Sequence, residues 1–218
     1  TVVPMVSSQD HKRVYDNDVG PNTGGMGTFS PSKIYDEAVA AQCMEKIFKP
    51  TIAAMTAEGR KFKGVLYFGL MITERGPVVI EYNSRFGDPE AQVVLPRLKN
   101  GIIDIFDAVI DEKLDTINIE WDNNAAVCVV LASGGYPASY KTGYEITGIK
   151  AAEEKGLLIF HAGTKKVDSK FVTAGGRVLG VTAVAENLQA AIDKAYEGVN
   201  LINFTDKHYR TDIGKKGL

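Results

Sequence analysis

A short apolar run that turns polar near the middle of the chain constrains the fold more than any other feature. Residues 78–80 are β-branched, which favours a strand. Alternate side chains of a strand share a face, so we expect Glu81, Asn83 and Arg85 to point the same way. The opposite face, against whatever covers the sheet, would then carry Val78, Ile80 and Tyr82.

The polar face has the donor chemistry of a metal and phosphate site. The Glu81 carboxylate and the Asn83 amide offer oxygen ligands, and Mg²⁺ is held by one or two carboxylates together with substrate phosphates. The planar guanidinium of Arg85 suits a phosphate oxygen. The alternative is an edge strand whose polar face is ordinary solvated surface.

The neighbouring residues predict a hairpin followed by a helix. Residues 64–72 indicate a buried strand, residues 74–77 a turn, and the polar strand would pair antiparallel with the first. Asp88 resembles an N-cap before Pro89 at the first helical position, with a short helix that runs until Pro96.

Two longer helices are predicted in the same part of the chain. Apolar residues recur with a helical period from Ile34 to Met55, where Pro50 should kink or split the helix. A second amphipathic helix is expected from Ile102 to Val109.

Residues 7–31 form the longest stretch without a regular pattern. Successive N–H groups of its glycine-rich part, residues 20–27, could form a nest that binds an anion. The stretch has neither Gly-x-Gly-x-x-Gly nor Gly-Lys-Ser/Thr, and a flexible surface loop is the alternative. The Gly175-Gly176-Arg177 turn is similarly open, because Arg177 could meet a phosphate or the glycines could serve only the backbone.

The pattern changes after a polar, helix-poor segment at 111–124, where we place a domain boundary. The expected domains are 1–115 and 124–218, and the fold class is α+β. The second domain would hold four strands and one helical stripe, at 125–132, 144–149, 157–161, 177–184 and 188–199. The chain opens on the strand-like run 2–6 without an initiating methionine, so we expect a piece of a larger polypeptide.

Composition excludes several classes of partner. A net charge of −2 gives no reason to expect nucleic acid or an anionic membrane. Cys43 and Cys128 lie far apart in apolar stretches, which indicates buried thiols of a reducing compartment. No segment reaches the roughly 18 apolar residues of a membrane span, and we expect a cytoplasmic protein.

Several phrases resemble a known family. Residues 9–13 with 20–27, and Glu81-x-Asn83-x-Arg85 with residues 86–90, are similar to phosphoribosylamine–glycine ligase (glycinamide ribonucleotide synthetase), of the ATP-grasp superfamily. Residues 132–137, 160–164 and 175–178 are similar too. The resemblance implies the C-terminal part of an ATP-grasp domain, an antiparallel sheet with helices, followed by a small α+β C-terminal domain.

The resemblance also implies an activity. The family joins glycine to 5-phosphoribosylamine with ATP, via glycyl phosphate, in de novo purine biosynthesis. This chain would be the C-terminal half and, lacking the N-terminal half of the same polypeptide, would be inactive alone. Another ATP-grasp carboxylate–amine ligase and a non-catalytic binding module are the alternatives.

Roles for single residues follow from the same resemblance. Glu81 and Asn83 would be ligands of Mg²⁺ or Mn²⁺, and Arg85 would be the catalytic arginine beside the transferred phosphoryl group. Many superfamily members carry a second metal carboxylate on the strand that precedes the Glu-x-Asn strand, and residues 68–71 of this chain offer none. The acceptor substrates would meet Lys12, Asn22, Thr23, Gly24, Gly25 and Asp88.

Overall fold

A computed structural model describes all 218 residues. The chain divides into two compact units, and each is described by itself. Unit 1 comprises residues 1–7, 32–87 and 98–122, and unit 2 comprises residues 8–31, 88–97 and 123–218. The expected mixture of helices and antiparallel sheets is confirmed. The domain limits 1–115 and 124–218 remain a prediction.

Unit 1 is a two-stranded hairpin with helices. Its strands are β5 (Tyr67–Thr73) and β6 (Gly76–Asn83), and their antiparallel pairing confirms the predicted hairpin. The expectation that the first strand is buried was wrong, because only Gly69 of β5 is buried. The helical elements are α1 (Glu37–Cys43), η2 (Met44–Phe48), α2 (Lys49–Ala57), α4 (Ile102–Ile110) and η4 (Leu114–Thr116).

The helical segment before the hairpin starts later than predicted. Asp36 caps α1 by accepting a hydrogen bond from the backbone N–H of Val39 at 2.8 Å. Proline lacks an N–H and crowds the preceding turn, and here the π-helical turn η2 directly precedes Pro50 at the start of α2. The helix therefore passes Pro50 through a local change of winding.

A β-bulge decides which side chains of the hairpin face the helices. Gly69 pairs with Glu81, whereas Leu70 pairs with Val79, so Ile80 is an extra residue on β6. Val79 packs with Phe68 and Leu70 against the core of Cys43, Ile47 and Phe48. The extra residue shifts the alternation by one, so the prediction that Val78, Ile80 and Tyr82 share the covered face was wrong, and Ile80 is 61% exposed.

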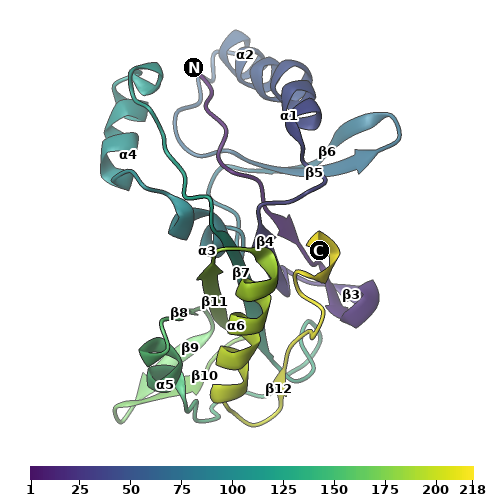
Figure 1. Cartoon of the computed structure of the whole chain (residues 1–218), viewed down its shortest axis with the longest axis vertical. Helices are drawn as coiled ribbons and strands as arrows, with labels where there is room; N and C mark the ends of the chain where they lie inside the picture. The colour runs from purple at the N-terminus through teal and green to yellow at the C-terminus, as the bar shows by residue number, and fades with distance from the viewer. The chain divides into compact units, whose positions relative to one another are not determined.

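Unit 2 is built on a six-stranded sheet (Figure 1). The main path runs β1–β4–β7–β11–β8, β12 also pairs with β7, and all pairings are antiparallel. The strands are β1 (Gln9–Asp10), β4 (Gly27–Ser30), β7 (Ala125–Ser133), β8 (Leu158–His161), β11 (Arg177–Ala185) and β12 (Lys207–His208).

Helices cover both faces of this sheet. The 14-residue helix α6 (Leu188–Leu201) contacts β7 and β11, as Figure 1 shows. The short helix α3 (Ala91–Val94) meets the opposite face, where Gln92 lies near Gly180. Every residue of β7 is buried as a result.

The remaining elements of unit 2 are small. They are β2 (Arg13–Tyr15), η1 (Asp16–Asp18), β3 (Val19–Asn22), η3 (Leu95–Arg97), α5 (Ile149–Glu154), β9 (Thr164–Val167), β10 (Lys170–Thr173) and η5 (Lys215–Gly217).

Three further predictions about elements were wrong. Residues 2–6 form no strand, and residues 144–149 make only isolated bridges before α5 begins. Residues 7–31 are not irregular, because they contain the four short strands β1 to β4, and β4 is buried against β7. None of the helices is both long and apolar enough to cross a lipid bilayer.

Candidate functional site

The predicted metal ligands lie on one face of β6. Glu81 pairs with Gly69 and Asn83 with Tyr67, so the two oxygen donors occupy alternate positions of a regular stretch. A Cβ on Gly69 would lie 2.8 Å from Glu81 Cγ, so the Glu81 side chain crosses the space that this glycine leaves open. The carboxylate is exposed. This part of the strand prediction is confirmed.

Arg85 does not continue the face of the strand. The strand ends at Asn83, and Arg85 lies in the bend that follows, where its Nη1 donates to the carbonyl of Phe86 at 2.7 Å. The alternation of β6 therefore does not extend to Arg85, and the prediction that it shares a strand face was wrong. The segment that carries Glu81, Asn83 and Arg85 is strand only as far as Asn83, and we call it the metal strand after its two predicted metal ligands, Glu81 and Asn83. No three or more His, Cys, Asp or Glu residues of the chain gather as a metal site.

Asp88 does not cap a helix, which corrects another prediction. The helix α3 starts at Ala91, and its N-cap position, Glu90, makes no capping hydrogen bond through its side chain. Asp88 is instead held by Arg177 of unit 2, whose Nη1 lies 3.1 Å from Asp88 Oδ1. The same Nη1 donates to the Asp88 carbonyl at 2.9 Å. Arg177 therefore binds the carboxylate that the local sequence pattern assigned to a helix cap.

In the glycine loop, residues 22–25, the N–H groups of the last three residues donate to other groups of the protein. The N–H of Thr23 donates to the Lys12 carbonyl at 2.7 Å, and the N–H of Gly25 donates to Thr23 Oγ1 at 2.9 Å. The N–H of Gly24 donates to the Tyr136 hydroxyl at 3.0 Å. An anion-binding nest needs these groups unoccupied, so that prediction was wrong for this conformation.

A buried carboxylate lies under the glycine loop. Asp10, whose side chain is 7% exposed, accepts a hydrogen bond from the His11 N–H at 2.7 Å and lies 3.0 Å from Lys12 Nζ. A Cβ on Gly25 would lie 2.8 Å from Asp10 Oδ1 and 2.5 Å from Pro89 Cδ, so only glycine fits here. Burial, followed by the charge of Glu90, raises the pKa of Asp10 to about 6.

His11, the next residue in the chain, is a second buried titratable group. Its ring is buried, Nδ1 lies 3.1 Å from the Gly27 carbonyl, and Nε2 has no hydrogen-bond partner. Burial, with a smaller contribution from the positive charge of Arg210, lowers the pKa of His11 to about 4. The imidazole is therefore uncharged at neutral pH.

The C-terminal residues hold the start of this region in place. Arg210 is fully buried; its Nη1 donates to the Arg13 carbonyl at 3.0 Å and to Asp18 Oδ1 at 3.1 Å. Its Nη2 donates to Asp212 Oδ2 at 2.7 Å. A buried guanidinium with this many partners fixes the chain around β2 and η1.

Sequence reasoning missed Asp10, Tyr136 and Arg210 as parts of the candidate site. Asp10 was within a matched phrase, yet nothing local predicted its burial. Tyr136 reaches the glycine loop from 112 positions away in sequence, and Arg210 binds the Arg13 carbonyl from 197 positions away. Only pairing information between distant segments could have found them.

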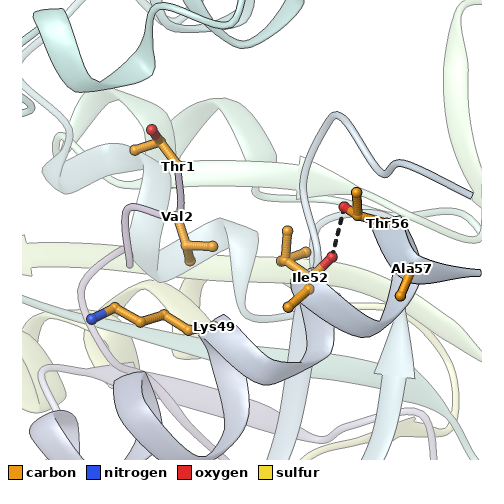
Figure 2. Close-up of a pocket in the computed structure, with 7 residues that line it drawn as sticks. Thr1, Val2, Lys49, Ile52, Thr56 and Ala57 are labelled. Atoms are coloured by element: carbon orange, nitrogen blue, oxygen red, sulfur yellow. Dashed lines mark hydrogen bonds between the residues drawn. The ribbon is translucent and has the colours of Figure 1, made fainter.

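A hollow of about 700 Å³ in unit 1 contains none of the predicted site residues (Figure 2). Its walls are mainly apolar, and Thr56 Oγ1 donates to the Ile52 carbonyl at 3.0 Å. The single charged side chain, Lys49, lies 2.5 Å from Glu45 Oε1. The lining residues are Thr1, Val2, Lys49, Ile52, Ala53, Thr56 and Ala57. We assign no site to this hollow.

Comparisons with known proteins cover most of the chain. Residues 1–91 match the family model described as phosphoribosylglycinamide synthetase, ATP-grasp (A) domain, and residues 126–216 match the phosphoribosylglycinamide synthetase C domain. The crystal structure of a phosphoribosylamine–glycine ligase from Thermotoga maritima is similar, with a TM-score of 0.85 and 36% identity. The likeness covers 95% of this chain and 51% of that one.

Curated sequences give the same result. A phosphoribosylamine–glycine ligase of Caldanaerobacter subterraneus is 45% identical over 212 residues, 97% of this chain and 50% of that protein. The trifunctional purine biosynthetic protein adenosine-3 of Gallus gallus is 49% identical over 219 residues, which is 22% of its length.

The match of residues 1–91 to an ATP-grasp (A) domain defines the class of protein. With both of its domain models matched, the chain belongs to the phosphoribosylglycinamide synthetase family, to which the resemblance pointed. The chain spans about half the length of the phosphoribosylamine–glycine ligases it matches.

Proposed function

We propose that this chain is part of an ATP-dependent carbon–nitrogen ligase. The enzyme would join glycine to 5-phosphoribosylamine, giving glycinamide ribonucleotide, ADP and phosphate in de novo purine biosynthesis. The observation that carries the proposal is the match of both units to one family, at 45% identity over 97% of the chain for one phosphoribosylamine–glycine ligase.

The reaction would proceed in two balanced steps. A carboxylate oxygen of glycine attacks the γ-phosphorus of ATP, and the bond to ADP breaks to leave glycyl phosphate. The amine nitrogen of phosphoribosylamine then attacks the carbonyl carbon, loses a proton, and expels phosphate. Phosphoryl transfer of this kind depends on positioning and electrostatics, which fixes what the protein must supply.

The metal strand fits a divalent cation. Glu81 and Asn83 offer two oxygen donors on one face, and Gly69 leaves room for the Glu81 side chain. Hard oxygen ligands suit Mg²⁺ or Mn²⁺. When bound, the ion would neutralise charge on the phosphates of ATP. Arg85 would stabilise the charge of the transferring phosphoryl group through its guanidinium.

The acceptor substrates would meet the glycine loop and its neighbours. Asn22 is exposed, and Thr23, Gly24 and Gly25 have a fixed backbone because their N–H groups are bonded internally. Contacts would therefore come from side chains such as Lys12, Asn22 and Asp88 and from carbonyl oxygens. We also keep the proposal that residues 1–115 and 124–218 are the functional domains.

Product formation tests this function. We expect the polypeptide that contains these residues to make glycinamide ribonucleotide only when glycine, phosphoribosylamine and Mg²⁺-ATP are all present, as measured by mass spectrometry. Glu81→Gln is nearly isosteric, so the fold should survive while turnover falls by roughly two to three orders of magnitude. Lys166→Ala, an exposed change on β9, is the matched control. Absence of product would contradict the proposed function, and near-normal turnover of Glu81→Gln at saturating Mg²⁺ would contradict the role of Glu81.

A further inference from the structure

One guanidinium joins two segments of the candidate acceptor site within unit 2. Arg177 is the first residue of β11, and its side chain is 24% exposed. Its Nη1 donates to the Gly24 carbonyl at 3.0 Å and to the Asp88 carbonyl at 2.9 Å, and lies 3.1 Å from Asp88 Oδ1. Gly24 and Asp88 are 64 positions apart in sequence, yet they share this single partner.

The face of the guanidinium also touches the glycine loop. A Cβ on Gly24 would lie 3.1 Å from Arg177 Cζ, 3.2 Å from Nη2 and 3.3 Å from Nε. The φ of Gly24 is not positive, so close approach rather than backbone conformation explains the glycine. A side chain at this position would press against the guanidinium plane.

The backbone N–H of the same residue is held as well. The Gly24 N–H donates to the Tyr136 hydroxyl, so side chains fix both its donor and its acceptor. The ring of Tyr136 lies against Gly176, where a Cβ would be 2.2 Å from Tyr136 Cδ2. The Gly175-Gly176-Arg177 turn thus gives Tyr136 and Arg177 their access to Gly24.

We infer that Arg177 is a positioning residue that fixes the glycine loop against Asp88, so that both present one surface to the acceptor substrates. This inference rests on the proposed function for the role of that surface. An ordinary ion pair would need only the Asp88 carboxylate. Here Nη1 binds two backbone carbonyls as well, while the plane of the guanidinium lies against Gly24. An ammonium group cannot lie flat against Gly24 in this way.

Hydrogen exchange tests the positioning without any assay of activity. In Arg177→Ala we expect the amides of Gly24 to Met26 to exchange at least tenfold faster, while the amides of β7 keep their wild-type rates. Lys166→Ala, which removes an exposed cation of the same unit, should change neither set. Unchanged exchange at Gly24 to Met26, or faster exchange throughout unit 2, would overturn the inference. If Arg177→Ala does not fold, Arg177→Lys is read by the same criteria.

Kinetics test the link to the substrates. In Arg177→Ala we expect the half-saturation constant of phosphoribosylamine or glycine to rise at least tenfold, and that of Mg²⁺-ATP to change less than twofold. Added guanidinium ion should restore part of the loss in Arg177→Ala and have no effect on Lys166→Ala. A lower active fraction with unchanged half-saturation constants would overturn the inference. If the unaltered protein forms no product, the proposed function fails, whereas the exchange result still decides the positioning.

Discussion

The metal strand and the glycine loop treat their polar groups in opposite ways. On the metal strand, Glu81 and Arg85 are exposed at the end of a two-stranded hairpin. In the glycine loop, the N–H groups of residues 23–25 are bonded to the protein, and the buried side chain of Asp10 lies close to Gly25. The charged side chains of the metal strand are exposed to solvent, whereas the hydrogen bonds of the glycine loop fix its backbone conformation.

The difference suggests a division of work. Oxygen donors that are to hold a metal and phosphates must remain accessible, since the ligands supply most of the coordination. A loop that is to orient small acceptors gains from being fixed before they arrive, because little entropy is then lost on binding. Changes to the metal strand should therefore affect chemistry, and changes around the glycine loop should affect shape and stability.

The largest effect should come from Arg85. Arg85→Lys keeps the charge and loses the fork, and if Arg85 stabilises the transferring phosphoryl group, the maximal rate should fall roughly 1,000-fold. Half-saturation constants should change little, as steady-state kinetics would show. Arg75→Lys, at an exposed position in the hairpin turn, is the matched control. A rise in the half-saturation constant of ATP with an unchanged maximal rate would instead assign Arg85 to ground-state binding.

The buried pair beside the glycine loop should show in the pH dependence of stability. The pKa of Asp10 is raised from 3.8 to about 6, so the folded protein keeps this proton up to a higher pH than the unfolded chain does. Stability is therefore lost as pH rises from 3.8 to about 6. The pKa of His11 is lowered from 6.5 to about 4, so stability is lost as pH falls from 6.5 to 4. In the unaltered protein, the two residues therefore change the free energy of unfolding in opposite directions as pH varies.

Replacing one of the two residues should leave the pH dependence of the free energy of unfolding that the other residue causes. Asp10→Asn should lose on the order of 3 kcal/mol between pH 6.5 and 4, and His11→Gln should lose a similar amount between pH 4 and 6. Urea unfolding of both variants and the unaltered protein across this range measures the slopes. If both variants follow the unaltered protein, the burial of the pair does not govern its titration.

The smallest effect should come from Gly69. Gly69→Ala places a Cβ 2.8 Å from Glu81 Cγ, so the carboxylate must move. We expect the Mg²⁺ concentration for half-maximal turnover to rise about tenfold, which corresponds to about 1.4 kcal/mol. Met71→Ala, two residues further along β5, is the control on the same face. Equal Mg²⁺ requirements for the two variants would show that Gly69 does not set the position of Glu81.

Local patterns predicted the long elements and failed where distant partners decide. The strands at β7, β8 and β11 and the helix α6 were predicted because their apolar periods are strong. The bulge at Ile80 depends on how β5 pairs with β6, which no single strand reveals. Residues 7–31 lack a period-2 pattern, and their strand β4 pairs with β1 and with β7, which is about 100 positions away.

The candidate site follows the same rule. The shared face of Glu81 and Asn83 was predictable because it needs only the alternation of one regular stretch. Asp88 was assigned to a helix cap because the local pattern Asp-Pro fits one, but Arg177 binds its carboxylate from β11. The bonding of the glycine loop was missed because Tyr136 approaches it through the tertiary fold.

Metal affinity tests the division between the two regions most directly. Electron paramagnetic resonance of free Mn²⁺, with ATP present, gives the dissociation constant of Mn²⁺ for each variant of the polypeptide that contains these residues. We expect Glu81→Gln to weaken Mn²⁺ binding at least tenfold and Asp10→Asn to change it less than twofold. Weakening by Asp10→Asn with unchanged binding in Glu81→Gln would place the metal in the region of the glycine loop and contradict the account.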